Sequence, residues 1–192
     1  MRLFEFLRDN KGDIQERWVN LVLDSYSEDA AAIFKREQDR FANPVGYSTR
    51  HTLTTLYSLL FDHDTPQFDQ LRPALEDFIK IRAVQTFTPA SAVAFVYDLK
   101  GVIRKAVSRD RAVEAGSVDW EQLHDTLDTV ALQVFDLYMA CRERLYKTQL
   151  NEYKSMNHML TQHGCPAAGL ADDTTKLMAD VHPLNIHSNE AR

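Results

Sequence analysis

Apolar residues recur at alternating steps of three and four along one long stretch of this sequence. The members of this stretch are Trp120, Leu123, Leu127, Val130, Val134, Leu137 and Cys141. Such spacing over three heptads places the side chains on one face of a helix and is typical of a packing seam. The pattern continues more loosely to Leu160, which predicts a helix of about 35 to 40 residues. Because such a helix is longer than a domain of this size needs, we expect its C-terminal half to project or to pair with another chain.

The scarcity of turn-forming residues also favours helices. The 192 residues include only six glycines and six prolines, which argues against a sandwich of many short strands. We therefore predict an all-α fold, a multi-helix bundle with a long C-terminal helix, for which globin-like packing is one option. Residues 1–160 are expected to form a helical domain. Residues 161–192 contain few aromatic side chains and are expected to form a mobile polar tail.

Three boundaries carry a side-chain oxygen directly before a proline. They are Asn43-Pro44, Thr65-Pro66 and Thr88-Pro89. An Asn or Thr side chain can accept a hydrogen bond from a free helix N–H, and proline suits the first helical position. Helices are therefore predicted to begin at Pro44, Pro66 and Pro89. Pro73 then predicts either a kink or the true start of the second of these helices.

Earlier in the chain, apolar spacing predicts a short first helix, a second over about 13–26 and a third over about 28–41.

Charge, hydropathy and motifs exclude several functions. The net charge is −6, so no basic face is evident and nucleic acid is not expected as a partner. The longest apolar run, Leu53–Phe61, is far shorter than a membrane span. The N-terminus lacks the apolar core of a signal peptide, and two cysteines make no disulfide framework, so a cytoplasmic location is expected. The common catalytic motifs are missing from the sequence, and we expect neither an enzyme nor a cofactor.

Polar residues set within apolar stripes are the strongest candidates for a site. Arg82 and Gln85 extend the apolar stripe of one predicted helix, so both are expected to face the interior. A buried guanidinium needs a partner, which Asp39 or Asp98 could supply as a purely structural pair. The alternative is a pocket for a small anion or polar ligand that uses Asn43, Arg82 and Gln85. The candidate ligand-binding residues are therefore Asp39, Asn43, Arg82 and Gln85.

The tail offers a second and weaker candidate. His163 and Cys165 lie close together there, and the Cys165-Pro166 pair is of a kind that can bind haem through a thiolate. The spacing does not match a zinc site, because it lacks a second CxxC or an HxxxH pair. Histidines also gather by chance in a polar tail. Whether this segment binds metal or haem therefore stays open.

Two connecting segments are similar to a known family. The segments are 39–46, DRFANPVG, and 81–95, IRAVQTFTPASAVAF, and the early Glu16-Arg17-Trp18 fits as well. They resemble the RsbRD N-terminal domain family, the sensory input domains of RsbT co-antagonist proteins, over about residues 3–146. The resemblance implies an all-helical, dimeric regulatory domain. In longer relatives this domain precedes a STAS domain that acts in partner-switching control of stress responses.

The resemblance shapes the functional expectation. Only 46 residues follow Tyr146, fewer than a STAS domain needs, so we expect a stand-alone form that lacks one. What carries over is the input role, namely a non-enzymatic regulatory module that binds a protein partner and forms a homodimer. The alternative is a sensor domain that binds a small molecule or haem.

Overall fold

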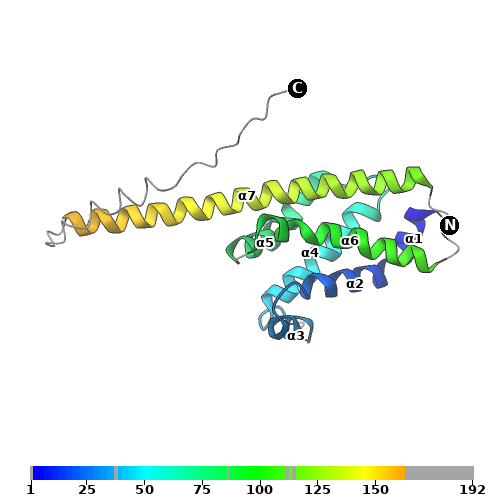
Figure 1. Cartoon of the computed structure of the whole chain (residues 1–192), viewed down its shortest axis with the longest axis horizontal. Helices are drawn as coiled ribbons and strands as arrows, with labels where there is room; N and C mark the ends of the chain where they lie inside the picture. The colour runs from blue at the N-terminus through cyan, green and yellow to red at the C-terminus, as the bar shows by residue number, and fades with distance from the viewer. Residues whose placement is uncertain (1, 37–38, 86, 111–112, 114–115, 163–192) are drawn as a thin grey trace, which may run out of the picture. The chain divides into compact units, whose positions relative to one another are not determined.

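The computed structural model describes residues 2–36, 39–85, 87–110, 113 and 116–162, with side chains to residue 158. The chain divides into two compact units, residues 1–145 and 146–192. Within the described residues all regular structure is helical, which confirms the all-α prediction. Figure 1 shows the ribbon. The globin-like option stays a prediction.

The described residues form seven α-helices and one short 3₁₀ helix. In chain order they are α1 (Leu3–Asp9), α2 (Lys11–Leu23), α3 (Glu28–Arg36), α4 (Pro44–Phe61), η1 (Phe68–Gln70), α5 (Leu71–Val84), α6 (Pro89–Arg109) and α7 (Ser117–Gln162).

The core of the first unit forms where the apolar faces of these helices meet. Helix α2 packs on α4 and α6, and α4 packs on α5 (Figure 1). The indole N–H of Trp18, on α2, donates to the Phe95 carbonyl oxygen on α6 at 2.7 Å, and their rings lie 6.2 Å apart. The Tyr57 hydroxyl of α4 donates to the Leu7 carbonyl oxygen of α1 at 2.9 Å. The large buried aromatic side chains thus carry hydrogen bonds that hold neighbouring helices in register.

Helix α7 begins with the predicted seam. All seam members except the half-buried Trp120 are buried in the core of the first unit. The helix runs for 46 residues, somewhat longer than the sequence pattern predicts. Asp119 lies in its first turn and accepts a hydrogen bond from the Gly116 N–H.

The proline rule is confirmed at two of its three boundaries. Helices α4 and α6 begin at Pro44 and Pro89, and the Asn43 and Thr88 side chains accept from the N–H groups of Gly46 and Ser91. The predicted start at Pro66 is wrong, because α5 begins at Leu71 after the 3₁₀ turn. Pro73 is the third residue of α5. Its missing N–H would have no partner inside the helix at this position, which explains why proline is tolerated there.

Helix α3 ends at Arg36 rather than at Phe41 as predicted. The cause is a local turn in which the Asp39 carboxylate accepts from the N–H groups of Phe41 and Ala42 at 2.8 and 2.9 Å. Aspartate side chains compete in this way with helical hydrogen bonds.

Asn43 joins the end of α3 to the start of α4. Its side-chain oxygen accepts from the Gly46 N–H at 2.8 Å, and its side-chain nitrogen donates to the Phe34 carbonyl oxygen at 3.0 Å. A Cβ atom at Gly46 would lie only 2.2 Å from the Asn43 nitrogen and 2.7 Å from the Phe34 oxygen. Position 46 therefore requires glycine, since there is no room for a side chain between the two helices.

The second unit contains the end of α7. Every residue from Tyr146 to His158 is exposed. The predicted tail, residues 161–192, lies outside the described residues except for the last two residues of α7. The predicted division of the chain at residue 160 therefore stays a prediction.

Two glycine substitutions test the α3–α4 joint. Gly46→Ala should lower the free energy of unfolding by about 1–3 kcal/mol, because the added methyl group overpacks the joint. Gly101→Ala is the matched control, since position 101 is exposed within α6 and nothing lies within 4 Å of the added Cβ. This control should gain about 0.5–1 kcal/mol. Urea unfolding measures both, and equal effects of the two substitutions would contradict the account of Gly46.

Candidate functional site

Arg82 lies in the last turn of α5 with only 1% of its surface exposed, which confirms that it faces the interior. Its Nη1 donates to the carbonyl oxygens of Ser91 and Ala92, at 3.1 and 3.4 Å, in the first turn of α6. Each carbonyl oxygen has two lone pairs, so it can accept from Arg82 in addition to a helical N–H. One edge of the guanidinium thus ties the end of α5 to the start of α6.

Three phenylalanine rings surround this guanidinium. Its central carbon lies 4.7 Å from the ring centre of Phe78, 4.8 Å from that of Phe87 and 5.4 Å from that of Phe95. We call Arg82 and these three rings the Arg82 cage. Cations are attracted to the faces of aromatic rings at such distances, most strongly where water is excluded.

The rest of the guanidinium lacks hydrogen-bond partners. Its Nε and Nη2 are buried and unpaired. Among the residues that the structure describes, Arg82 makes no ion pair, so the structure does not show the pairing with Asp39 or Asp98 that the sequence suggests. Buried unpaired donors are rare in folded proteins, and those of a charged group are the most costly.

Two groups, the Tyr26 hydroxyl and the Asp98 carboxyl, interact electrostatically with the Arg82 guanidinium. Burial raises the pKa of the Tyr26 phenol and the pKa of the half-buried Asp98 carboxyl above their ordinary values, and the Arg82 charge opposes both shifts. Burial also lowers the pKa of Arg82 itself. The Tyr26 hydroxyl is buried and has no hydrogen-bond partner of good geometry. The ring of Tyr26 packs edge-on against Phe34 and Phe87, with centroid distances of 5.2 and 5.4 Å.

The four predicted site residues come from two places in the first unit. Gln85 ends α5 one turn after Arg82, and its side-chain oxygen is buried and unpaired. Asp39 and Asn43 lie in the α3–α4 connection, where both side chains bind backbone groups. The two places are linked through Phe34, whose carbonyl accepts from Asn43 and whose ring contacts Tyr26. A ligand-binding role for these four residues stays a prediction.

Two hydrogen bonds join helix α7 to the end of α5 and to the connection between α5 and α6. The Tyr138 hydroxyl donates to the Phe87 carbonyl oxygen at 2.5 Å. Nη1 of Arg142 donates to the Ala83 carbonyl oxygen at 3.0 Å. The same residue, Phe87, therefore covers the guanidinium with its ring and binds α7 with its backbone.

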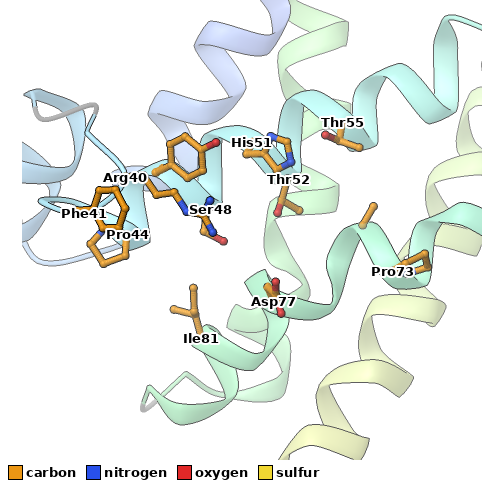
Figure 2. A pocket seen from close by; sticks show the side chains of 12 residues that line it. Arg40, Phe41, Pro44, Ser48, His51, Thr52, Thr55, Pro73, Asp77 and Ile81 are labelled. Atoms are coloured by element: carbon orange, nitrogen blue, oxygen red, sulfur yellow. The ribbon is translucent and has the colours of Figure 1, made fainter.

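A groove of about 620 Å³ opens between α4 and α5, a size common for small-molecule sites (Figure 2). Arg40, Phe41 and Pro44 gather at one end, while His51 and Asp77 extend from the two helices (Figure 2).

The polar groups of this α4–α5 groove are already engaged. The Arg40 guanidinium lies over the Tyr47 ring, with 5.8 Å between its central carbon and the ring centre, and that ring stacks on His51. Asp77 pairs with Lys80 at 3.5 Å and is well exposed. The charged groups of the groove pair with other residues or are exposed to water. The groove therefore has fewer unsatisfied polar groups that a ligand could bind than the Arg82 cage has.

Sequence reasoning missed the aromatic members of the cage. Phe78 precedes Arg82 by four residues on one helix, so contact between them could have been expected. Phe87, Phe95 and Tyr26 come from other elements, and their approach depends on how α2, α5 and α6 pack.

The described residues contain neither a cluster of metal-ligating side chains nor a helix that could span a membrane. In this part of the chain, no three His, Cys, Asp or Glu side chains gather in a way that could hold a metal ion. None of the helices there combines the length and apolar character needed to cross a bilayer. His163 and Cys165, the candidate haem ligands, lie outside the described residues, so the haem hypothesis stays a prediction.

Comparison with known proteins identifies the family. The family described as the RsbT co-antagonist protein rsbRD N-terminal domain matches residues 12–153, which is most of the chain. The chain belongs to this family. The match confirms the resemblance and includes α3 to α6, hence the whole Arg82 cage. No curated protein and no solved structure matches this RsbRD N-terminal domain.

Two substitutions test whether Arg82 has a counter-ion within the RsbRD N-terminal domain. Arg82→Met should melt at or above the wild-type temperature, because removal of the charge strands no carboxylate and methionine packs well against aromatic rings. Arg82→Ala should be destabilised by about 2–5 kcal/mol, because it leaves a cavity. Thermal unfolding followed by circular dichroism measures both. A methionine variant as unstable as the alanine variant would indicate a buried anionic partner.

Proposed function

We propose that this RsbRD N-terminal domain is a non-enzymatic regulatory module that receives a signal and transmits it to a protein partner. The observation that carries the proposal is the family match over residues 12–153, since the family is named for the N-terminal domain of a co-antagonist protein. The sequence supports a non-enzymatic role, because none of the common catalytic motifs occurs in it. The cytoplasmic location stays a prediction.

The end of α7 is the surface that we propose for contact with a second copy of this chain. Large apolar side chains are exposed there at Tyr146, Leu150, Tyr153 and Met156, with exposed fractions of 42–58%. Their spacings of four, three and three place them on one face of the helix. Exposed apolar stripes of this kind are typical of helices that pair, and Lys147, Glu152 and Lys154 supply charged groups beside the stripe.

A test in the source organism addresses the regulatory role. Deletion of the gene should change the transcript levels of stress-response genes after a stress, and the wild-type gene should restore them. A copy with Leu150→Glu should not restore them if α7 contacts are needed for signalling. Unchanged stress-response transcripts in the deletion strain, across heat, salt and oxidative stress, would contradict the proposal.

Self-association provides a direct prediction. Light scattering of the purified full chain at micromolar concentration should give the mass of a dimer, and Tyr153→Glu should give a monomer, because it places a charge in the apolar stripe. Ser155→Glu is the matched control, since it adds the same charge on the opposite face of α7 and should leave the dimer intact. A wild-type monomer, or equal effects of the two substitutions, would rule out the stripe as the dimer surface.

A further inference from the structure

The unpaired edge of Arg82 has a defined geometry. A planar guanidinium presents its N–H groups as a rigid fork, and the Nε and Nη2 hydrogens point in the same direction along one edge. These are the two nitrogens without partners, whereas Nη1, which belongs to another edge, is bonded to α6. Two parallel N–H groups match the two oxygens of a carboxylate. The structure therefore leaves open the edge of the guanidinium that is suited to bidentate binding.

The energetics of the site favour a bound anion. A buried cation without a counter-ion costs free energy that an apolar side chain of similar size would avoid. In the described part of the chain no carboxylate pairs with Arg82, and the groups that interact with its charge are the Tyr26 hydroxyl and, to a smaller extent, the Asp98 carboxyl. A bound anion would supply the missing charge and both missing hydrogen bonds.

Another arginine shows why Arg82 stands out. Arg50 also has a buried and unpaired Nε, but this residue is partly exposed and its Nη2 donates to the Lys35 carbonyl oxygen at 3.0 Å. Only Nε of Arg50 is both buried and unpaired, so its guanidinium offers no open two-nitrogen edge like that of Arg82.

Tyr26 separates the Arg82 cage from a hollow on the surface. The hollow has a volume of about 370 Å³ and lies over the α2–α3 connection, where Asp24, Tyr26 and Lys35 are among its lining residues. Tyr26 packs edge-on against Phe34 and Phe87, and its hydroxyl interacts with the Arg82 guanidinium without a hydrogen bond of good geometry. Rotation of this ring toward solvent would remove this interaction, which an anion bound to Arg82 would replace.

We propose that Arg82 anchors a binding site for a small carboxylate, and that Tyr26 is the side chain that moves to admit it. The carboxylate group accepts from Nε and Nη2 of Arg82, and the short remainder of the molecule points toward the surface hollow. The three phenylalanine rings restrict the ligand to a small size. The claim that this ligand is the signal received by the module rests on the function proposed above. The claim that the ligand binds does not.

Calorimetric titration of the full-length chain with sodium pyruvate tests the proposal, with sodium acetate, inorganic phosphate and sodium chloride at matched ionic strength as the other probes. Pyruvate is expected to bind saturably, with one site per chain and millimolar or tighter affinity. Chloride should not bind. Saturable binding of phosphate without binding of either carboxylate would overturn the ligand class. Absence of carboxylate binding up to about 10 mM would overturn the site.

Variants locate the binding. Arg82→Met should weaken pyruvate binding at least about tenfold, because it removes two charge-assisted hydrogen bonds. Arg82→Lys should weaken it similarly, since lysine keeps the charge but lacks the fork, and it serves if the methionine variant does not fold. Arg72→Met, on the exposed side of α5, removes the same charge and should leave the affinity unchanged.

Undiminished binding in folded Arg82→Met or Arg82→Lys would place the site elsewhere and overturn the proposal.

Tyr26→Ala should increase the association rate measured by stopped flow, because it removes the ring that closes the site. An unchanged association rate would overturn the role of Tyr26. Each of these outcomes is independent of the light-scattering result, so failure of the carboxylate site and failure of self-association can be told apart.

Discussion

A guanidinium group buried among aromatic rings, with no carboxylate paired to it in the described part of the chain, is the feature that defines the centre of this domain. Arg82 joins α5 to α6 through the carbonyl oxygens of Ser91 and Ala92, and three phenylalanine rings cover the charge. Attraction between the cation and the rings offsets part of the cost of removing the charge from water. An apolar side chain would fill the same space at lower cost, and the carboxylate site proposed above would give this charge a function.

The Arg82 cage contacts two parts of the molecule through which a signal could pass, namely Tyr26 and α7. Phe87 covers the guanidinium, contacts Tyr26 and accepts a hydrogen bond from Tyr138 of α7. A ligand that displaced Tyr26 would therefore change the packing around a residue that α7 holds directly. Further along α7, the exposed apolar stripe is the surface proposed for the second copy. The proposed ligand binding and the proposed self-association would thus both involve α7, and a coupling between them would be a measurable free energy.

Local patterns in the sequence determine much of this fold. The seam of α7 and the starts of α4 and α6 were predictable, because apolar periodicity and proline caps act within a few residues of the chain. The start of α5 was not, because a 3₁₀ turn after Pro66 delays the helix to Leu71. The burial of Arg82 was predictable from its place in an apolar stripe. Its surroundings were not, because Tyr26, Phe87 and Phe95 meet it only through packing between helices.

The most direct test of this account is the exchange of the Arg82 Nε–H proton with water, measured by ¹H–¹⁵N NMR on the ligand-free full-length chain. The resonance is assigned by its absence in Arg82→Met. The account predicts a slowly exchanging proton whose shift is displaced by the neighbouring rings, because the group is buried in the folded state. A proton that exchanges as fast as those of exposed arginines, at an ordinary shift, would show that the guanidinium is hydrated and would contradict the account.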